Sequence, residues 1–356
     1  TGNGTTALIL SYMSFAIGYI AGPFGAIFFG HIGDRKGRKV TMYASLLMMG
    51  ISTSIIGILP PAASAGVGVV IVLQLMRLAQ CFGRGGTWGG GILMAYENVP
   101  ENKRSFYAAI PQIGLPIGFG LSSILIAVPT LLLPEDIFFT WGWRIPFLAA
   151  IILTLIVIRQ KGEMMETEDY KKAQAKLEAE EAEGKKHKVG FIPMVKGYWK
   201  TLLLGCGTRW VDGTFYNIFI VWILSYCINW LGMPLIQTYI ITIIACIFKI
   251  PFTLFGGWCA QKLGNTRTFV IGALASAVLS IPTLKVIELS KGNLAITIIG
   301  IVLGWSIAYN LIWAVISSLW SSYFETEVRY SGISLLLHHR DHHGYSVLSA
   351  RPDSDN

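Results

Sequence analysis

Charged side chains inside apolar stretches are the residues of this sequence that could do chemistry. Arg209 and Asp212 are spaced i, i+3, so on a helix they share one face and can form an ion pair. An acid that exchanges its arginine partner for a proton is a natural element of proton coupling. A plain structural ion pair that eases membrane insertion is the alternative. Lys249 lies near the middle of the next apolar stretch and could bind an anion or pair with Asp212.

Two arginines, Arg77 and Arg84, lie inside the apolar stretch 68–95. A charge at the centre of a bilayer costs about 2.5–3.5 kcal/mol on insertion scales, so such residues usually face a cavity or a partner. Both could hold an anionic substrate by paired hydrogen bonds. The predicted substrate-binding and proton-coupling residues are Arg77, Gln80, Arg84, Trp88, Arg209, Asp212, Tyr216 and Lys249.

The elements that must position these charges are membrane-spanning helices. The chain is 53% hydrophobic and 13% charged, whereas soluble domains carry about 25% charged residues. We therefore expect an all-α, multi-pass protein whose main partner is the lipid bilayer. The net charge of +8 does not indicate nucleic-acid binding, because the basic residues follow the loops and form no continuous stripe. The sequence predicts nine spans of about 20 residues, at 6–29, 40–60, 68–95, 106–128, 144–158, 202–228, 235–258, 268–286 and 294–319.

A charged hairpin at residues 30–39 separates the first two spans. Its charges, from Asp34 onward, cannot lie in hydrocarbon, and its four cations place it on the cytoplasmic side. We expect a tight loop in which glycines such as Gly37 permit a sharp turn. Residues 257–266 repeat the pattern, with Gly264 at the position of Gly37. This weak repeat indicates two duplicated bundles, with substrate bound between them near the middle of the membrane.

The stretch 159–201 differs from its surroundings because it is charged and, over residues 171–188, rich in Lys, Glu and Ala without an aromatic residue. We interpret it as a solvated, partly helical cytoplasmic linker between the bundles. A site of interaction is the less favoured alternative.

Four motifs, in the expected order, resemble one family. Residues 30–39 resemble the signature loop between the second and third helices of the major facilitator superfamily. Residues 77–90 resemble the fourth helix of its metabolite:proton symporter branch, residues 141–147 its entry to the sixth helix, and residues 328–332 its loop after the tenth. The resemblance implies a secondary active transporter of the bacterial inner membrane, working by alternating access. It would symport protons with a small organic acid or zwitterion, such as shikimate, a dicarboxylate, a tricarboxylate, proline or betaine.

The resemblance also implies roles for particular residues. In relatives the signature loop acts as a conformational latch, whose acid engages the positive end of the eleventh helix and a nearby arginine and favours the outward-open state. The predicted gate residues are Gly30, Asp34, Arg35, Gly37 and Arg38. A merely basic loop that sets topology is the alternative. Arg77 matches the fourth-helix arginine, whereas Thr87 replaces a usual glutamate and so removes a candidate proton carrier.

Compared with twelve family helices, the first and the last two are missing. The family continues after Ser334 into a Gly-rich eleventh helix, whereas here a polar stretch follows, so we expect Asp34 to find no helix end to engage. A non-transporting, truncated remnant is therefore the alternative function. The predicted parts are an N-terminal bundle lacking its first helix at 1–158, the linker at 159–201, a C-terminal bundle lacking its last two helices at 202–334, and a disordered His-rich tail at 335–356.

Other chemistries find little support in the sequence. The five cysteines are singletons, which give neither a disulfide framework nor zinc spacing. The histidine box at 339–343 is too isolated to supply a di-iron site, and there is no phosphate-binding glycine loop. We expect no enzyme, no catalytic residue, no cofactor and no metal, and a monomeric protein. Most aromatic residues should form interfacial belts; Trp88, Tyr216 and Trp222 are the candidates for a cavity.

Overall fold

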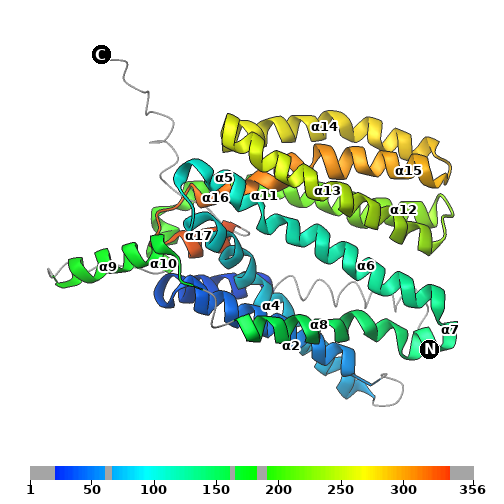
Figure 1. The fold of residues 1–356 in the computed structure, drawn as a ribbon, viewed down its shortest axis with the longest axis horizontal. Coiled ribbons are helices and arrows are strands. Elements are labelled where there is room, and N and C mark those ends of the chain that lie inside the picture. Colours follow the sequence, from blue (N-terminus) through cyan, green and yellow to red (C-terminus); the bar gives the residue numbers. More distant parts are fainter. Residues whose placement is uncertain (1–20, 61–65, 161–164, 183–190, 337–356) are drawn as a thin grey trace. The chain divides into compact units, whose positions relative to one another are not determined.

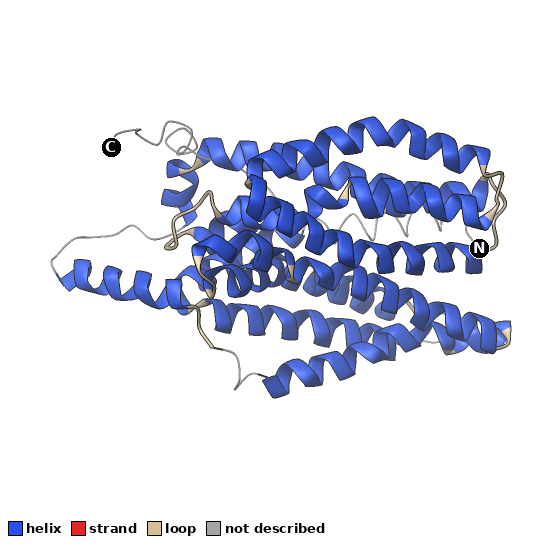
Figure 2. Cartoon of the chain, turned by 45° about the horizontal axis from the view of Figure 1, so that its top comes forward, coloured by secondary structure: helices blue, strands red, loops and turns tan. Residues whose placement is uncertain are grey.

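The computed structural model describes residues 21–60, 66–160, 165–182 and 191–336, and all regular structure in these ranges is helical (Figure 2). The expected all-α, multi-pass fold is confirmed. Within these ranges, six helical runs are long and apolar enough to cross a membrane, and each coincides with a predicted span. They are Arg38–Ile58, Glu101–Leu132, Gly142–Gln160, Leu235–Leu263, Asn265–Leu289 and Leu294–Ser321.

The other three predicted spans are not among these six runs. Most of 6–29 lies outside the described residues, of which 21–36 form a helix. The span 68–95 corresponds to α4, Val67–Glu97. The span 202–228 corresponds to a run from α11, Trp199–Asn217, through a π-helical segment, Ile218–Trp222, to α12, Ile223–Asn229. The total of nine spans stays a prediction.

Contacts divide the chain into two units, each assembled from separated segments: 1–94, 144–205 and 323–356 form unit 1, and 95–143 and 206–322 form unit 2. This grouping is not the contiguous division at 159–201 predicted above, and those domain boundaries stay a prediction. The helices α4 and α11 contribute to both units.

Unit 1 is built around two helices, α2 (Arg38–Ile58) and α8 (Ile145–Gln160), which pack along each other (Figure 1). Several side chains of α8 are apolar and exposed, among them Ile152 at 63% and Leu155 at 58%. Such a face is stable only against lipid or another apolar surface. The remaining helices of unit 1 are residues 21–36, most of α4, α9 (Glu168–Ala182), α10 (Phe191–Gly197), the start of α11 and α17 (Arg329–Leu336).

Unit 2 is centred on α13, Leu235–Leu263, which packs against α5, α6, α14 and α16 (Figure 1). A second π-helical segment, Val302–Ala308, joins α15 to α16 into one membrane-spanning run. The other helices of this unit are the end of α4, α5 (Arg104–Ala109), α6 (Gly114–Leu132), α7 (Glu135–Thr140), most of α11, α12, α14 (Asn265–Leu289), α15 (Leu294–Ile301) and α16 (Asn310–Ser321). Short 3₁₀ turns occupy Glu101–Lys103, Pro111–Ile113 and Gly142–Arg144.

The predicted hairpin at 30–39 is tighter than expected. Its first part is helical up to residue 36, and α2 begins at Arg38, so Gly37 alone turns the chain. Gly37 has φ 102° and ψ 158°, and Gly264, its counterpart in the weak repeat, has φ 90° and ψ 153° before α14. The same glycine geometry therefore begins a helix at both copies, which supports the repeat.

These two glycines provide a matched pair of substitutions. Their backbone conformation is close to one that only glycine adopts easily, so alanine should cost about 1–3 kcal/mol of unfolding free energy at either position. A Cβ at Gly37 would also collide with the Glu166 carboxylate, whereas a Cβ at Gly264 would meet nothing within 4 Å. We expect Gly37→Ala to destabilise the protein more than Gly264→Ala in denaturant unfolding. Equal losses would contradict the packing of Glu166 on Gly37.

Candidate functional site

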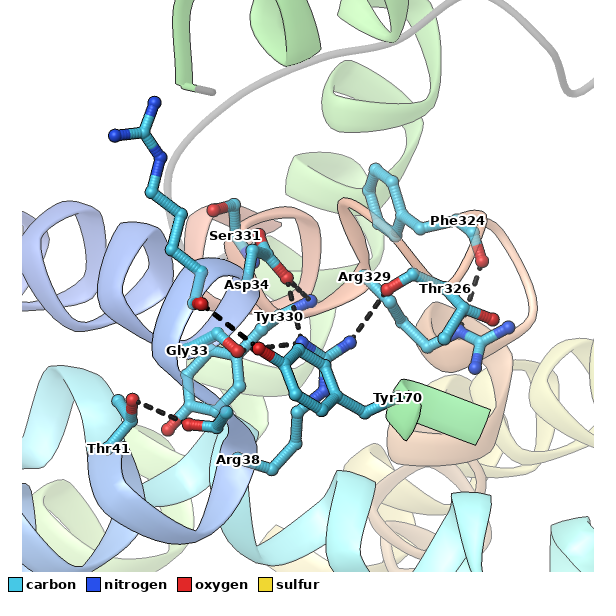
Figure 3. A network of polar contacts seen from close by, with 12 residues as sticks. Gly33, Asp34, Arg38, Thr41, Tyr170, Phe324, Thr326, Arg329, Tyr330 and Ser331 are labelled. Atoms are coloured by element: carbon cyan, nitrogen blue, oxygen red, sulfur yellow. Dashed lines mark hydrogen bonds and ion pairs between the residues drawn. The ribbon is translucent and has the colours of Figure 1, made fainter. Parts of the chain in front are cut away.

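The Asp34 carboxylate binds the N-terminus of α17. It accepts hydrogen bonds from the backbone N–H groups of Tyr330, at 3.1 Å, and Ser331, at 3.0 Å, as Figure 3 shows. N–H groups in the first turn of a helix have no acceptor within the helix, and this positive end of the helix favours a negative charge. The expectation that Asp34 finds no helix end is therefore wrong, because residues 329–332, predicted as a loop, form the first turn of α17.

The side chain of Arg38 ties this acid to two backbone carbonyls. Arg38 has no exposed surface. Its Nη1 donates to the Asp34 carboxylate at 3.2 Å and to the Gly33 carbonyl at 2.7 Å, and its Nη2 donates to the Thr326 carbonyl at 2.7 Å. The guanidinium thus connects the end of helix 21–36 with the segment that leads into α17.

Residues of the predicted linker complete the network. The Tyr170 hydroxyl donates to the Arg35 carbonyl at 3.0 Å, and its ring centroid lies 4.8 Å from Arg38 Cζ (Figure 3). The Glu166 carboxylate accepts hydrogen bonds from the backbone N–H groups of Arg38, at 2.9 Å, and Lys39, at 3.2 Å. The start of the linker is therefore docked on the gate residues rather than only solvated. Neither Glu166 nor Tyr170 was a predicted site residue.

The remaining gate residues lie around this network. Gly30 is close to α17, since a Cβ there would lie 3.0 Å from Ser331 Cα. The side chain of Arg35 is exposed. We call Asp34, Arg38, Glu166, Tyr170 and the first turn of α17 the gate network. Its parts come from helix 21–36, α2, α9 and α17, all within unit 1.

Burial raises the pKa of the Asp34 carboxyl to about 6, against the lowering effects of the Arg38 guanidinium and the N–H groups of Ser331 and Tyr330. A carboxyl whose pKa is higher in the folded protein than in the unfolded chain binds its proton more tightly in the folded state. The contribution of this group to the free energy of unfolding is fully present below pH 3.8 and is lost as the pH rises through 6.

Acidification should therefore stabilise the gate network. We expect wild-type protein to gain about 1 kcal/mol of unfolding free energy between pH 7 and pH 5 from this group. In Asp34→Asn the same contribution should be absent. Thermal unfolding of both proteins at the two pH values measures the difference. An identical pH response in the two proteins would contradict this role of Asp34.

The candidates on α4 lie in unit 1. Gln80 Nε2 donates to Thr53 Oγ1 at 2.6 Å, which fixes α4 against α2. Arg77 and Trp88 are half-buried, and Arg84 is exposed. The role of these four residues in substrate binding stays a prediction.

A buried charge cluster lies in unit 2. The Asp212 side chain is 1% exposed and pairs with Arg209, as the i, i+3 spacing predicts. Its other oxygen accepts a hydrogen bond from the Tyr309 hydroxyl at 2.6 Å. Tyr216 follows Asp212 by one helical turn and is half-buried. Asp212 thus has two donors, of which one comes from its own helix, α11, and the other from the run Leu294–Ser321.

Lys249 lies at the middle of α13 and is 1% exposed. Its Nζ lies 4.4 Å from the ring centroid of Tyr309, 5.0 Å from that of Trp305 and 5.8 Å from that of Trp313. Cation–π attraction accounts for this arrangement. Since Tyr309 contacts both Lys249 and Asp212, the two charged residues belong to one cluster.

These three aromatic residues were missed by the sequence analysis, which favoured Trp88, Tyr216 and Trp222. Trp222 is 52% exposed and stacks on Tyr226, and its place in a cavity stays a prediction. The signal that could have identified Trp305, Tyr309 and Trp313 is their i, i+4, i+8 spacing, which places them along one helix face. The π-helical segment Val302–Ala308 lies within this run, and π-bulges are frequent at functional sites.

Comparison with known proteins identifies the family to which the chain belongs. The sequence profile of the Major Facilitator Superfamily matches residues 3–337. The chain belongs to this superfamily. It is 32% identical over 338 residues to the inner membrane metabolite transport protein YhjE of Escherichia coli (strain K12), an alignment that covers 94% of this chain and 74% of YhjE. The shikimate transporter of the same organism is 29% identical over 348 residues, covering 96% of this chain and 74% of the relative.

Solved structures agree about the fold. The proton:xylose symporter XylE bound to 6-bromo-6-deoxy-D-glucose superposes with a TM-score of 0.77 at 17% identity, covering 95% of this chain and 77% of XylE. The predicted resemblance to the superfamily's metabolite transporters is confirmed. The protein is a transporter and a multi-pass protein of the bacterial inner membrane.

Proposed function

We propose that the protein symports a small carboxylate-bearing metabolite with protons by alternating access. The observation that carries the proposal is the environment of Asp212, an acid with no exposed surface that is paired with Arg209 and Tyr309. Burying an ionised carboxylate in a membrane is expensive unless it is paired, and protonation removes its charge. Asp212 can therefore exchange Arg209 for a proton as substrate binds.

The substrate class follows from shared chemistry. Shikimate, proline, betaine, dicarboxylates and tricarboxylates, the substrates that the family resemblance implies, all carry a carboxylate. The similarity to a shikimate transporter supports this class of small organic acid or zwitterion. The protein would work as a monomer, with the lipid bilayer, the substrate and protons as its partners. Two bundles would rock around a central site, and the gate network would stabilise one of the two states.

Transport into liposomes tests the proposal. The full chain would be reconstituted and an inward proton gradient imposed, with labelled shikimate, citrate, 2-oxoglutarate or betaine outside. At least one of these compounds should accumulate above equilibrium, and a protonophore should abolish the accumulation. Accumulation that a protonophore does not change would contradict proton coupling. No uptake of any compound, despite correct insertion, would instead favour a non-transporting remnant.

A further inference from the structure

Two buried hydrogen-bond donors lie next to each other in unit 2 without an acceptor. Lys249 is 1% exposed and Trp305 is 2% exposed. Neither Lys249 Nζ nor Trp305 Nε1 has a hydrogen-bond partner among the described residues, and Nζ lies 5.0 Å from the centroid of the Trp305 ring. A buried unpaired donor costs about 1–3 kcal/mol, and a charged one costs more. Two such donors side by side indicate a built site for an acceptor.

The backbone around these donors is held firmly. Asn310 Nδ2 donates to the Lys249 carbonyl at 2.8 Å and to Thr253 Oγ1 at 2.9 Å. Ser306, which follows Trp305, donates its hydroxyl to the Ala245 carbonyl at 2.8 Å. These bonds join α13 to the run that carries Trp305, so the two donors are positioned before a ligand arrives.

Other buried indoles nearby have satisfied N–H groups. Trp313 Nε1 donates to the Gln112 carbonyl at 3.1 Å, and Trp320 Nε1 donates to Thr208 Oγ1 at 2.9 Å. Trp305 therefore differs from its neighbours on the same run, since it alone of the three lacks an acceptor among the described residues. The difference points to a ligand that accepts from Trp305.

The charges of the cluster indicate what that ligand is. Asp212 is already paired with Arg209, and Lys249 Nζ has no hydrogen-bond partner among the described residues, so a protonated Lys249 calls for an anion. We propose that Lys249 and Trp305 bind the carboxylate of the transported metabolite, one donor to each carboxylate oxygen. This inference rests on the proposed function, because it takes the substrate to be a carboxylate.

A carboxylate fits this site better than a neutral hydroxyl group does. A hydroxyl oxygen could accept from both donors but would leave an ammonium charge on Lys249 unbalanced in a membrane-spanning run. The rings of Tyr309 and Trp313, 4.4 Å and 5.8 Å from Lys249 Nζ, are apolar neighbours that exclude water from it. A charge-assisted pair is strengthened by such surroundings.

Binding to the purified full chain tests this inference without any proton gradient. Labelled shikimate, proline and glycine betaine would be measured by equilibrium dialysis, with the methyl esters of shikimate and proline as competitors that lack the carboxylate. Trp305→Phe keeps a ring but removes the N–H, and should weaken binding of the preferred carboxylate about 10-fold. Lys249→Met should weaken it at least about 100-fold. Trp320→Phe, the same change at an indole outside the cluster, is the control and should bind like wild type.

The outcomes separate this inference from the proposed function. Carboxylate binding that both variants weaken, and that the methyl esters do not displace, would support the site. Equal binding by wild type, Lys249→Met and Trp305→Phe would overturn it, while proton-driven carboxylate uptake could still be found. If the site binds carboxylates as expected but protonophores do not affect uptake, proton coupling fails and the site stands. Thermal unfolding of each variant confirms that weakened binding reflects the site and not the fold.

Discussion

Replacing Asp212 by asparagine should sharply reduce proton-driven accumulation of substrate. Asparagine has almost the same shape and can still bond to Tyr309, but it cannot take up a proton. We expect accumulation against a gradient to fall about 100-fold, which is the scale of losing a hydrogen bond to a charged group. Exchange of labelled for unlabelled carboxylate, which needs no net proton movement, should persist within about 10-fold of wild type.

The control for this prediction is another acid with the same local pairing. Glu288 forms an i, i+3 ion pair with Lys285 in the same unit, and its side chain is 56% exposed. Because water solvates this pair, Glu288→Gln should leave both accumulation and exchange unchanged. If Asp212→Asn accumulates substrate as wild type does, Asp212 is only a structural partner of Arg209.

Removing the side chain of Arg38 should have the second-largest effect, this time on stability. The change to alanine leaves the carbonyls of Gly33 and Thr326 without this donor and Asp34 without its buried counter-ion. Breaking a buried ion pair by removing one partner costs about 3–5 kcal/mol. Arg38→Ala should lose this amount in denaturant unfolding of the detergent-solubilised protein.

Two companion variants make the Arg38 result specific. Lys36 lies two residues away and is exposed, so Lys36→Ala should stay within about 0.5 kcal/mol of wild type. Arg38→Lys keeps the charge but lacks the planar guanidinium that reaches three acceptors at once. Its unfolding free energy should fall between those of the wild type and Arg38→Ala. Wild-type stability in Arg38→Ala would show that the gate network contributes nothing to the fold.

Local sequence patterns predicted the parts of the site that depend on one helix. The pairing of Arg209 with Asp212 follows from their spacing on α11, and the hairpin was recognisable from charge between apolar runs. Six spans followed from hydropathy alone, because a bilayer requires each crossing to be long, apolar and helical.

Contacts between distant segments could not be predicted in this way. Glu166 caps α2 from 128 residues away, and Tyr309 donates to Asp212 across 97 residues. Such pairings depend on how helices pack, and hydropathy carries little information about packing. The same limit explains why Trp305, Tyr309 and Trp313 were missed, since exposed and buried aromatic residues look alike in an apolar run.

The failure to foresee the partner of Asp34 has a different cause. A membrane-spanning eleventh helix needs about 20 apolar residues, and a helix end was predicted only where such a stretch exists. Capping requires only the first turn of a helix, because the free N–H groups lie there. The start of α17 supplies that turn at Tyr330 and Ser331.

Proton movement coupled to carboxylate entry is the central claim, and a pH electrode measures it directly. Liposomes that contain the full chain would be suspended in weak buffer with no imposed gradient, and shikimate, proline or betaine would be added outside. The account predicts that the transported compound makes the external medium more alkaline, and that the signal is absent with Asp212→Asn. Entry of a labelled carboxylate with no change in external pH would contradict it.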